Sequence, residues 1–176
     1  MLHNAPFWFK ALIQRGDAFF SKAPSPLLDF GIKEGMHVVE IACGAGTHLS
    51  QAARLVGSDG LITAIDSSPA AISAVNERAF RKGHFQIMGR LADGHEIPLD
   101  DQTADLIYTF ALFSAPSPLP LLLQEVHRIL APHGHFFVHP QKTKKSFMAR
   151  QFLGSNLFIP DGEAGGCLRF CPRKKG

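Results

Sequence analysis

Residues 38–50 read VVEIACGAGTHLS, an apolar run that contains one acid, Glu40, and continues into a turn with two glycines. The run over 37–42 predicts a buried strand, and the pattern over 47–56 predicts the helix that follows it. Glycines let such a turn approach a ligand closely, and the free N–H groups at a helix start favour an anionic group. The stretch therefore predicts a ligand site at the end of a buried strand.

The composition is typical of a globular domain. The chain has 176 residues, of which 45% are hydrophobic and 19% charged, and its net charge of +3 gives no reason to expect a nucleic-acid partner. Cys43, Cys167 and Cys171 lack the number and spacing of a disulfide framework, which indicates a reducing, cytoplasmic setting. We expect Cys167 and Cys171 to share one buried strand face. The sequence shows neither an apolar run of ~20 residues nor a signal peptide, so no transmembrane segment is expected.

Strand-like and helix-like patterns alternate along the chain, which predicts a parallel α/β sheet with right-handed crossovers. Further strands are expected over 61–66, 84–88, 105–110 and 135–139. A helix that starts at Ser68 and Pro69 is expected to bury Ile72, Val75, Ala79 and Phe80, and another is expected over 119–130. A helix over 143–155 and two strands over 157–160 and 167–173 predict an antiparallel hairpin at a sheet edge.

Two cofactors fit the glycine turn, a dinucleotide and S-adenosylmethionine. Asp66 lies 22 residues past Gly44, where it could accept hydrogen bonds from ribose hydroxyls in either case. A dinucleotide site requires a third glycine, and Leu49 occupies that position. The charge of Glu40 would repel a pyrophosphate, but it would attract the ammonium and sulfonium of S-adenosylmethionine by about 1 to 4 kcal/mol at ~4 Å. The residues favour S-adenosylmethionine.

Four segments occur in order at familiar spacing: VVEIACGAGTHLSQAARL, LITAIDSSPAAISAV, ADGHEIPLDDQTADLIYTFALF and LLLQEVHRILAPHGHFFVHPQ. Over residues 30–141 the chain resembles class I S-adenosylmethionine-dependent methyltransferases (methyltransferase type 11) of the kind found in ubiquinone and menaquinone biosynthesis. The resemblance implies an α/β, Rossmann-like sheet of seven mostly parallel strands, with an antiparallel C-terminal hairpin and helices on both faces. It also implies one domain over 1–176: an N-terminal helical cover (1–30), a cofactor-binding core (31–141), and a closing helix with an edge hairpin (142–176).

The resemblance also implies the roles of individual residues. Phe110 would line the methyl-donor side, and Gly89-Arg90 competes with Asp93-Gly94 for the adenine position. The implied cofactor-binding set is Glu40, Ala42, Cys43, Gly44, Ala45 and Gly46 at the methionine part, Asp66 and Ser67 at the ribose, and Asp93 and Gly94 at the adenine.

The chain departs from the family pattern at two turns. Ala42 stands where the family commonly has glycine, which is tolerable if its backbone angles are ordinary. The turn Pro132-His133-Gly134 replaces Pro-Gly-Gly, which is harmless if Gly134 carries the unusual angles.

The acceptor and the base are less well specified. The implied enzyme methylates a small molecule, with His139 as the candidate general base, although an in-line displacement can proceed without one. The apolar stretch over 4–24 predicts a helical cover or lid, or else a membrane-surface segment suited to a lipid-like acceptor. His135 and His139 have no acid or cysteine at a suitable spacing, so no metal is predicted. A homodimer could close the cleft, and a catalytically silent S-adenosylmethionine-binding module that acts through a protein partner is the alternative function.

Overall fold

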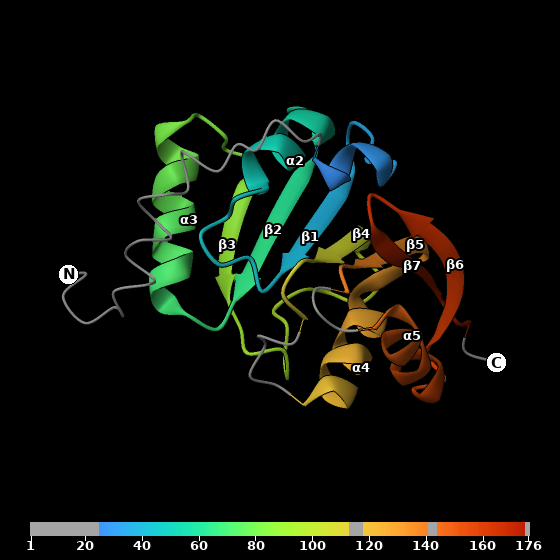
Figure 1. The fold of residues 1–176 in the computed structure, drawn as a ribbon. Helices are drawn as coiled ribbons and strands as arrows, with labels where there is room; N and C mark the ends of the chain where they lie inside the picture. The colour runs from blue at the N-terminus through green and yellow to red at the C-terminus, as the bar shows by residue number, and fades with distance from the viewer. Residues whose placement is uncertain (1–24, 113–117, 141–143, 175–176) are drawn as a thin grey trace.

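The computed structural model describes residues 25–112, 118–140 and 144–174. They form a seven-stranded sheet in the order β3-β2-β1-β4-β5-β7-β6 (Figure 1). Residues 1–24 of the cover that was predicted over 1–30 lie outside the described residues. The strands are β1 (His37–Ile41), β2 (Leu61–Asp66), β3 (Ile87–Leu91), β4 (Ala104–Thr109), β5 (Leu130–Val138), β6 (Phe158–Ala164) and β7 (Cys167–Pro172). The helices are the 3-10 helix η1 (Pro26–Asp29), α2 (Leu49–Val56), α3 (Pro69–Arg81), α4 (Leu119–Ile129) and α5 (Lys145–Gly154).

The sheet is mixed in the way that the sequence predicts. Strands β3, β2, β1, β4 and β5 are parallel, and β7 runs antiparallel to both of its neighbours, β5 and β6. This order confirms a mostly parallel α/β sheet with an antiparallel C-terminal hairpin. Pro160 lies in the edge strand β6, where a missing N–H costs no central ladder bond.

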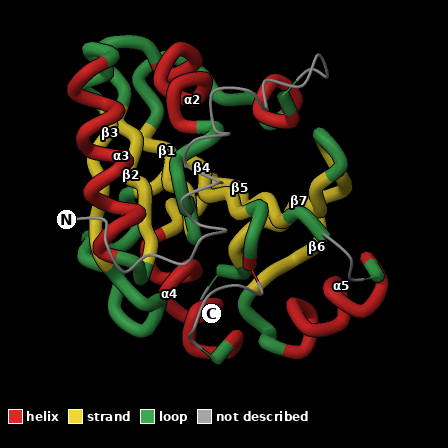
Figure 2. The backbone as a smooth tube through the Cα atoms, turned by 60° about the vertical axis from the view of Figure 1, so that its left-hand side comes forward, coloured by secondary structure: helices red, strands yellow, loops and turns green. Residues whose placement is uncertain are grey.

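Two apolar cores cover the two faces of the sheet, which explains why its strands read as nearly continuous apolar runs. Val38 packs with residues of η1, α2 and α3, and its neighbour Val39 packs with residues of α4 and α5. Figure 2 shows the strands between α2 on one side and α4 and α5 on the other. In the described parts of the chain, no helix is long and apolar enough to cross a bilayer.

The helix start at Ser68 is as expected. Its hydroxyl accepts a hydrogen bond from the amide N–H of Ala71 at 3.4 Å, and Pro69 takes the first helical position. The prediction of which residues α3 buries is only partly correct. Ala71, Val75 and Ala79 are buried, but Phe80 is 76% exposed because it lies about 100° round the helix from Ala79.

The third strand begins three residues later than predicted. The amide N–H of His84 donates to the carbonyl of Ala79 at 3.0 Å, so His84 still belongs to the turn that ends α3. Phe85 is 80% exposed in that turn. Phe85, an apolar residue next to the true strand, extended the strand pattern backward, and the prediction of a strand over 84–88 is wrong at its start.

The fifth strand begins earlier than predicted, at Leu130, and Pro132-His133-Gly134 lies inside it as an irregularity in the pairing with β4. The φ of Gly134 is outside the left-handed region, so the expectation of unusual angles there is wrong. A Cβ on Gly134 would lie 2.7 Å from Leu130 Cδ1 and 2.9 Å from the carbonyl oxygen of Asp105. Glycine is needed at this position because the neighbouring strand comes too close for a side chain.

Candidate cofactor site

The glycine turn between β1 and α2 is built from left-handed backbone. Ala42, Gly44 and Gly46 have φ values of 55°, 51° and 69°. A Cβ on Gly44 would meet none of the described atoms within 4 Å, so the turn is open to a ligand there. Ala42 therefore does not have ordinary backbone angles, and that expectation is wrong. An alanine in this region is strained by roughly 1 to 2 kcal/mol relative to its usual conformation.

Gly46 is packed where Gly44 is open. A Cβ on Gly46 would lie 2.7 Å from Leu49 Cδ1 and 3.0 Å from Val75 Cγ2. Leu49 is buried and fills the space at the position where a dinucleotide site has its third glycine. That glycine serves to bring helix and strand together, so the bulk of Leu49 disfavours the dinucleotide alternative.

Helix α3, which follows α2 and β2 along the chain, holds the glycine turn in place. Nη1 of Arg78, in α3, donates to the carbonyls of Ala45 at 3.2 Å and Gly46 at 3.5 Å. The amide N–H of Gly46 donates to the carbonyl of Cys43 at 2.9 Å. Burial raises the pKa of the Cys43 thiol, so it packs as a neutral side chain beneath the turn. Sequence reasoning missed Arg78, which reads as a surface charge on an amphipathic helix.

Glu40 lies one residue inside the end of β1 and is only 3% exposed. Its Oε2 accepts a hydrogen bond from Tyr108 Oη at 3.1 Å. Burial raises the pKa of this carboxyl to about 8, against the opposing effect of the tyrosine bond and with a smaller raising effect from nearby Asp66. The charge of Glu40 is therefore largely suppressed at neutral pH and would be restored by a cation. Its partner Tyr108 follows only from the pairing of β1 with β4.

Asp66, at the end of β2, ties the glycine turn to its neighbour strand. Oδ2 accepts from the amide N–H of Gly44 at 2.8 Å, and Oδ1 accepts from the amide N–H of Ser68 at 2.9 Å. Each carboxylate oxygen keeps a second lone pair, which could accept a ribose hydroxyl. Ser67 is exposed beside it. The structure thus brings Glu40, the turn and Asp66 to one end of the sheet.

Asp93 and Gly94 come directly after β3, whose end lies beside Asp66. The amide N–H of Ala92 donates to the carbonyl of Asp66 at 3.1 Å. Asp93 is exposed and its Oδ1 accepts from the amide N–H of His95 at 2.9 Å. Gly89 and Arg90 instead lie within β3, paired with β2 before its end. This placement favours Asp93-Gly94 over Gly89-Arg90, and the adenine contact itself stays a prediction.

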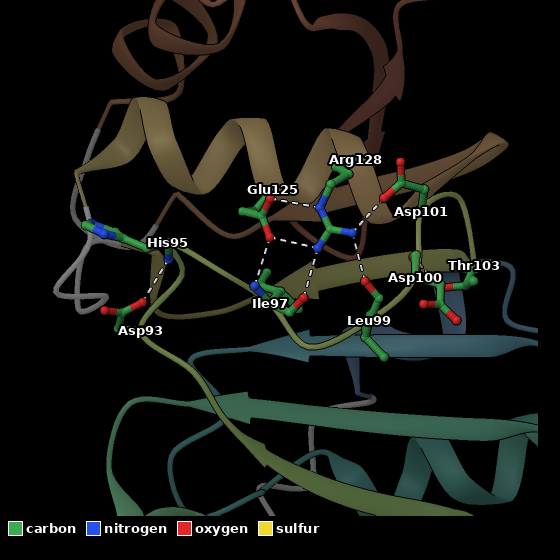
Figure 3. A network of polar contacts seen from close by, with 9 residues as sticks. All are labelled: Asp93, His95, Ile97, Leu99, Asp100, Asp101, Thr103, Glu125 and Arg128. Carbon is green, nitrogen blue, oxygen red and sulfur yellow. Dashed lines mark hydrogen bonds and ion pairs between the residues drawn. The ribbon is translucent and has the colours of Figure 1, made fainter.

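Arg128, in the last turn of α4, holds the loop that carries Asp93 (Figure 3). Nη2 donates to the carbonyl of Ile97 at 2.9 Å, and Nη1 to the carbonyl of Leu99 at 2.8 Å. Nη1 also reaches Oδ1 of Asp101 at 2.7 Å, and Glu125 pairs with Arg128 while accepting from the amide N–H of Ile97 at 2.8 Å. Sequence reasoning missed this network, because nothing in the segment around Arg128 indicates its partners.

Aromatic rings gather around Phe110, just past the end of β4. Ring centroids lie 4.3 Å away in His48, 5.5 Å in Tyr108, 6.0 Å in His139 and 6.3 Å in Phe30. Burial lowers the pKa of His48, which favours a neutral imidazole. We call these five residues the aromatic rim. It connects the predicted Phe110 and His139, through Tyr108, to Glu40.

This arrangement fits S-adenosylmethionine. Gly44 leaves open space at the turn, Glu40 is a buried acid suited to a cation, and Asp66 can accept from ribose hydroxyls. Sheet order, glycine turn and carboxylates together define a Rossmann-like protein that binds a nucleoside-containing cofactor beyond the carboxyl ends of its strands.

The comparison with protein families names this class more closely. The sequence model of the family described as "Methyltransferase domain" matches residues 32–156, and the chain belongs to that family. The match confirms the resemblance to class I S-adenosylmethionine-dependent methyltransferases, for which S-adenosylmethionine is the cofactor.

Individual relatives are more distant. The chain is 29% identical over 107 residues to a "Demethylmenaquinone methyltransferase" of Staphylococcus aureus, covering 60% of this chain and 43% of the relative. It is 30% identical over 102 residues to a "Probable phthiotriol/phenolphthiotriol dimycocerosates methyltransferase 2" of Mycobacterium ulcerans, covering 58% and 38%. The chain thus spans less than half the length of these curated relatives. A crystal structure of a SAM-dependent methyltransferase from Aquifex aeolicus has the same fold, with a TM-score of 0.75, 23% identity, and coverage of 96% and 97%.

Proposed function

We propose that this chain transfers a methyl group from S-adenosylmethionine to a small-molecule acceptor. The observation that carries the proposal is Glu40, a buried acid beside the open glycine turn. An acid in an apolar run is costly unless a partner compensates it, and Tyr108 offers one hydrogen bond but no positive charge. The ammonium of the methionine part would supply that charge.

The protein's part in the reaction is mainly to position and desolvate. S-adenosylmethionine supplies a methyl group bonded to a positively charged sulfur. When the acceptor attacks the methyl carbon, the carbon–sulfur bond breaks and the rest of the cofactor leaves as a neutral thioether. In our proposal the glycine turn and Glu40 hold the methionine end, Asp66 and Ser67 the ribose, and Asp93-Gly94 the adenine. Alignment of this kind can contribute roughly 7 to 11 kcal/mol to an in-line displacement. If the acceptor loses a proton, His139 is the candidate to take it.

The aromatic rim supports an apolar or ring-containing acceptor. Phe110, just past β4, and the neutral His48, at the start of α2, are partly exposed on a buried Phe30, and the acceptor would meet the methyl group beside them. The two curated relatives carry the names of lipid-like acceptors, which agrees with this class. We therefore propose a lipid-like small molecule as the acceptor. We also propose a cytoplasmic setting and a homodimer that closes the acceptor side of the site.

The alternative function is a catalytically silent module that binds the cofactor and acts through a protein partner. Two measurements test the cofactor assignment and distinguish this module from an active methyltransferase. Thermal melting with S-adenosylhomocysteine at 100 times its Kd should raise Tm by about 5 to 10 °C, because the ligand adds about 2.7 kcal/mol. NAD at the same concentration should leave Tm unchanged. A rise with NAD alone would overturn the cofactor assignment.

Methyl-labelled S-adenosylmethionine, incubated with the protein and separate lipid and aqueous cell extracts, should give a labelled product in the lipid fraction. Asp66→Ala is the matched control: it should bind the cofactor at least tenfold more weakly and lose the product. Label in the aqueous fraction alone would reject the lipid-like acceptor. Tight cofactor binding with no labelled product in either fraction would favour the silent module.

A further inference from the structure

Three chemically reactive side chains meet on the sheet face opposite α5, far along the chain from one another. His135 lies in β5, Asp161 in β6 and Cys171 in β7, three neighbouring strands. One ligand atom from each of them lies within 4.8 Å of the other two, and His135 Nε2 is 3.4 Å from Asp161 Oδ2. All three are half-exposed, so an ion in solution can reach them.

The donor set is selective for one kind of metal. A thiolate, an imidazole and a carboxylate are the ligands that Zn²⁺ takes, whereas Mg²⁺ and Ca²⁺ prefer oxygen alone. Tetrahedral bonds of about 2.0 to 2.3 Å place the ligand atoms about 3.4 to 3.6 Å apart. The pair of His135 and Asp161 is already at that separation, and Cys171 needs a shift of about 1 Å. Cys171 lies in β7 between β5 and β6, whereas Asp161 lies in the edge strand β6, which has a neighbour on one side only and can move toward it.

Arg169 completes the surroundings. Its Nε donates to Asp161 Oδ2 at 2.9 Å and lies 2.6 Å from the carbonyl oxygen of the same residue. A carboxylate that binds a metal is commonly hydrogen-bonded by a further residue that fixes its orientation, and Arg169 is placed to do so. Burial and the negative charge of Asp161 raise the pKa of the Cys171 thiol. A divalent cation among the three would reverse that effect and deprotonate the thiol.

We propose that His135, Asp161 and Cys171 form a Zn²⁺ site that fastens the C-terminal hairpin to the parallel sheet. His139 directly follows β5, four residues and roughly 13 Å beyond His135 along the extended chain. The three ligands lie outside the residues assigned to the cofactor and leave the fourth position of the ion to a water molecule, so the proposed effect of the ion is on stability and is independent of the proposed methyl transfer. Asp161 and Cys171 follow His135 by 26 and 36 residues. Sequence spacing gave no sign of a site because only the pairing of β5, β7 and β6 unites these residues.

Cobalt and zinc binding to the full chain, free of any affinity tag, test the site. Co²⁺ should give a near-ultraviolet thiolate-to-metal band at one equivalent, and Zn²⁺ should abolish it. Zn²⁺ at 100 times its Kd should raise Tm by about 5 to 10 °C, and EDTA should reverse the rise. Cys171→Ser and Asp161→Asn should each lose the band and the Tm rise.

His133→Ala is the matched control, because His133 lies two residues from His135 in the same strand and contacts Asp105 instead. It should keep both signals. A thiolate band that survives Cys171→Ser, or a Tm rise that disappears equally in His133→Ala, would overturn the site and leave only adventitious binding. Absence of a band in the unaltered protein would overturn it outright.

Discussion

The glycine turn over 42–48 and the loop over 92–103 both lie at the predicted cofactor end of the sheet, but they are held in different ways. The first is shaped by its own backbone, with three residues in left-handed conformation and short hydrogen bonds to Asp66 and Cys43. The second has one main anchor, Arg128, which reaches two of its carbonyls from another helix. Changes in backbone freedom should damage the first loop, and loss of one side chain should damage the second.

The largest effect is expected from Gly46→Ala. The added methyl group would overlap Leu49 and Val75 and would occupy a φ of 69°, so crowding and backbone strain add. We expect a loss of roughly 2 to 4 kcal/mol in the free energy of unfolding, measured by urea denaturation.

Gly44→Ala is the matched control, since its φ of 51° is similar and its surroundings among the described residues are open. It should cost about 1 kcal/mol in stability while weakening cofactor binding. Equal destabilisation by the two changes would show that packing beneath Gly46 is not what holds the turn.

The next largest expected effect is the pH dependence of cofactor affinity, because Glu40 should release a proton when the cofactor binds. Because the pKa of Glu40 is raised to about 8, the carboxyl is mostly neutral below that pH in the free protein. The protonated carboxyl contributes to the stability of the free protein. This contribution is complete below the pKa that Glu40 has in the unfolded chain, and it is lost as the pH rises through about 8. The cation of the cofactor reverses this preference, so affinity should increase from pH 6 to 8 by up to about tenfold per unit.

Isothermal titration calorimetry in buffers of different ionisation enthalpy measures that proton directly. Above pH 8 the affinity should fall again as the α-ammonium of the cofactor, with a pKa of about 7.7 to 8.0, loses its charge. Glu40→Gln keeps the shape and removes the titration, so its affinity should be lower at pH 8 and nearly flat from pH 6 to 7.5. A flat profile for the unaltered protein would exclude Glu40 as the group that meets the cation.

The two loops also show which part of the site a sequence can predict. Gly44, Gly46 and Asp66 mark the first loop because their roles are local: a glycine permits a backbone conformation, and a strand end positions an acid. Neither Arg78 nor Arg128 could be assigned from the sequence, since each acts on carbonyls about 30 residues away. The parallel α/β sheet and the hairpin followed from alternating periodicities, whereas the start of β3 did not, because Phe85, an apolar residue in a turn, imitates a strand residue.

Arg128→Ala should free the second loop. Four partners lose charge-assisted hydrogen bonds, and Glu125 keeps only the amide N–H of Ile97. With the arginine side chain 29% exposed, we expect about 2 kcal/mol of lost stability, measured by urea denaturation, and faster hydrogen exchange confined to 92–103.

The pH dependence identifies the partner. The arginine bond lowers the pKa of Glu125, so this contribution is present above the carboxyl's unfolded pKa and disappears as the pH falls through the folded one. Arg81→Ala, which removes an exposed pair with Glu77 at 3.9 Å, should cost less than about 0.5 kcal/mol. Exchange that is unchanged over 92–103 in Arg128→Ala would show that the loop is held by other contacts.

The smallest effect runs in the opposite direction. Ala42 has a φ of 55°, where an alanine is strained and a glycine is not, so Ala42→Gly should stabilise the protein. The greater freedom of glycine in the unfolded chain offsets part of the gain, which leaves about 0.5 to 1 kcal/mol, or about 1 to 4 °C in Tm by calorimetry. Ala45→Gly is the control three residues on, outside the left-handed region, and should destabilise by a similar amount. If Ala42→Gly stabilises but weakens cofactor binding, the strain at Ala42 serves to hold the turn in its binding conformation. If cofactor binding strengthens as well, the strain at Ala42 has no role in binding, and the methyl group of Ala42 keeps the turn from its best binding conformation.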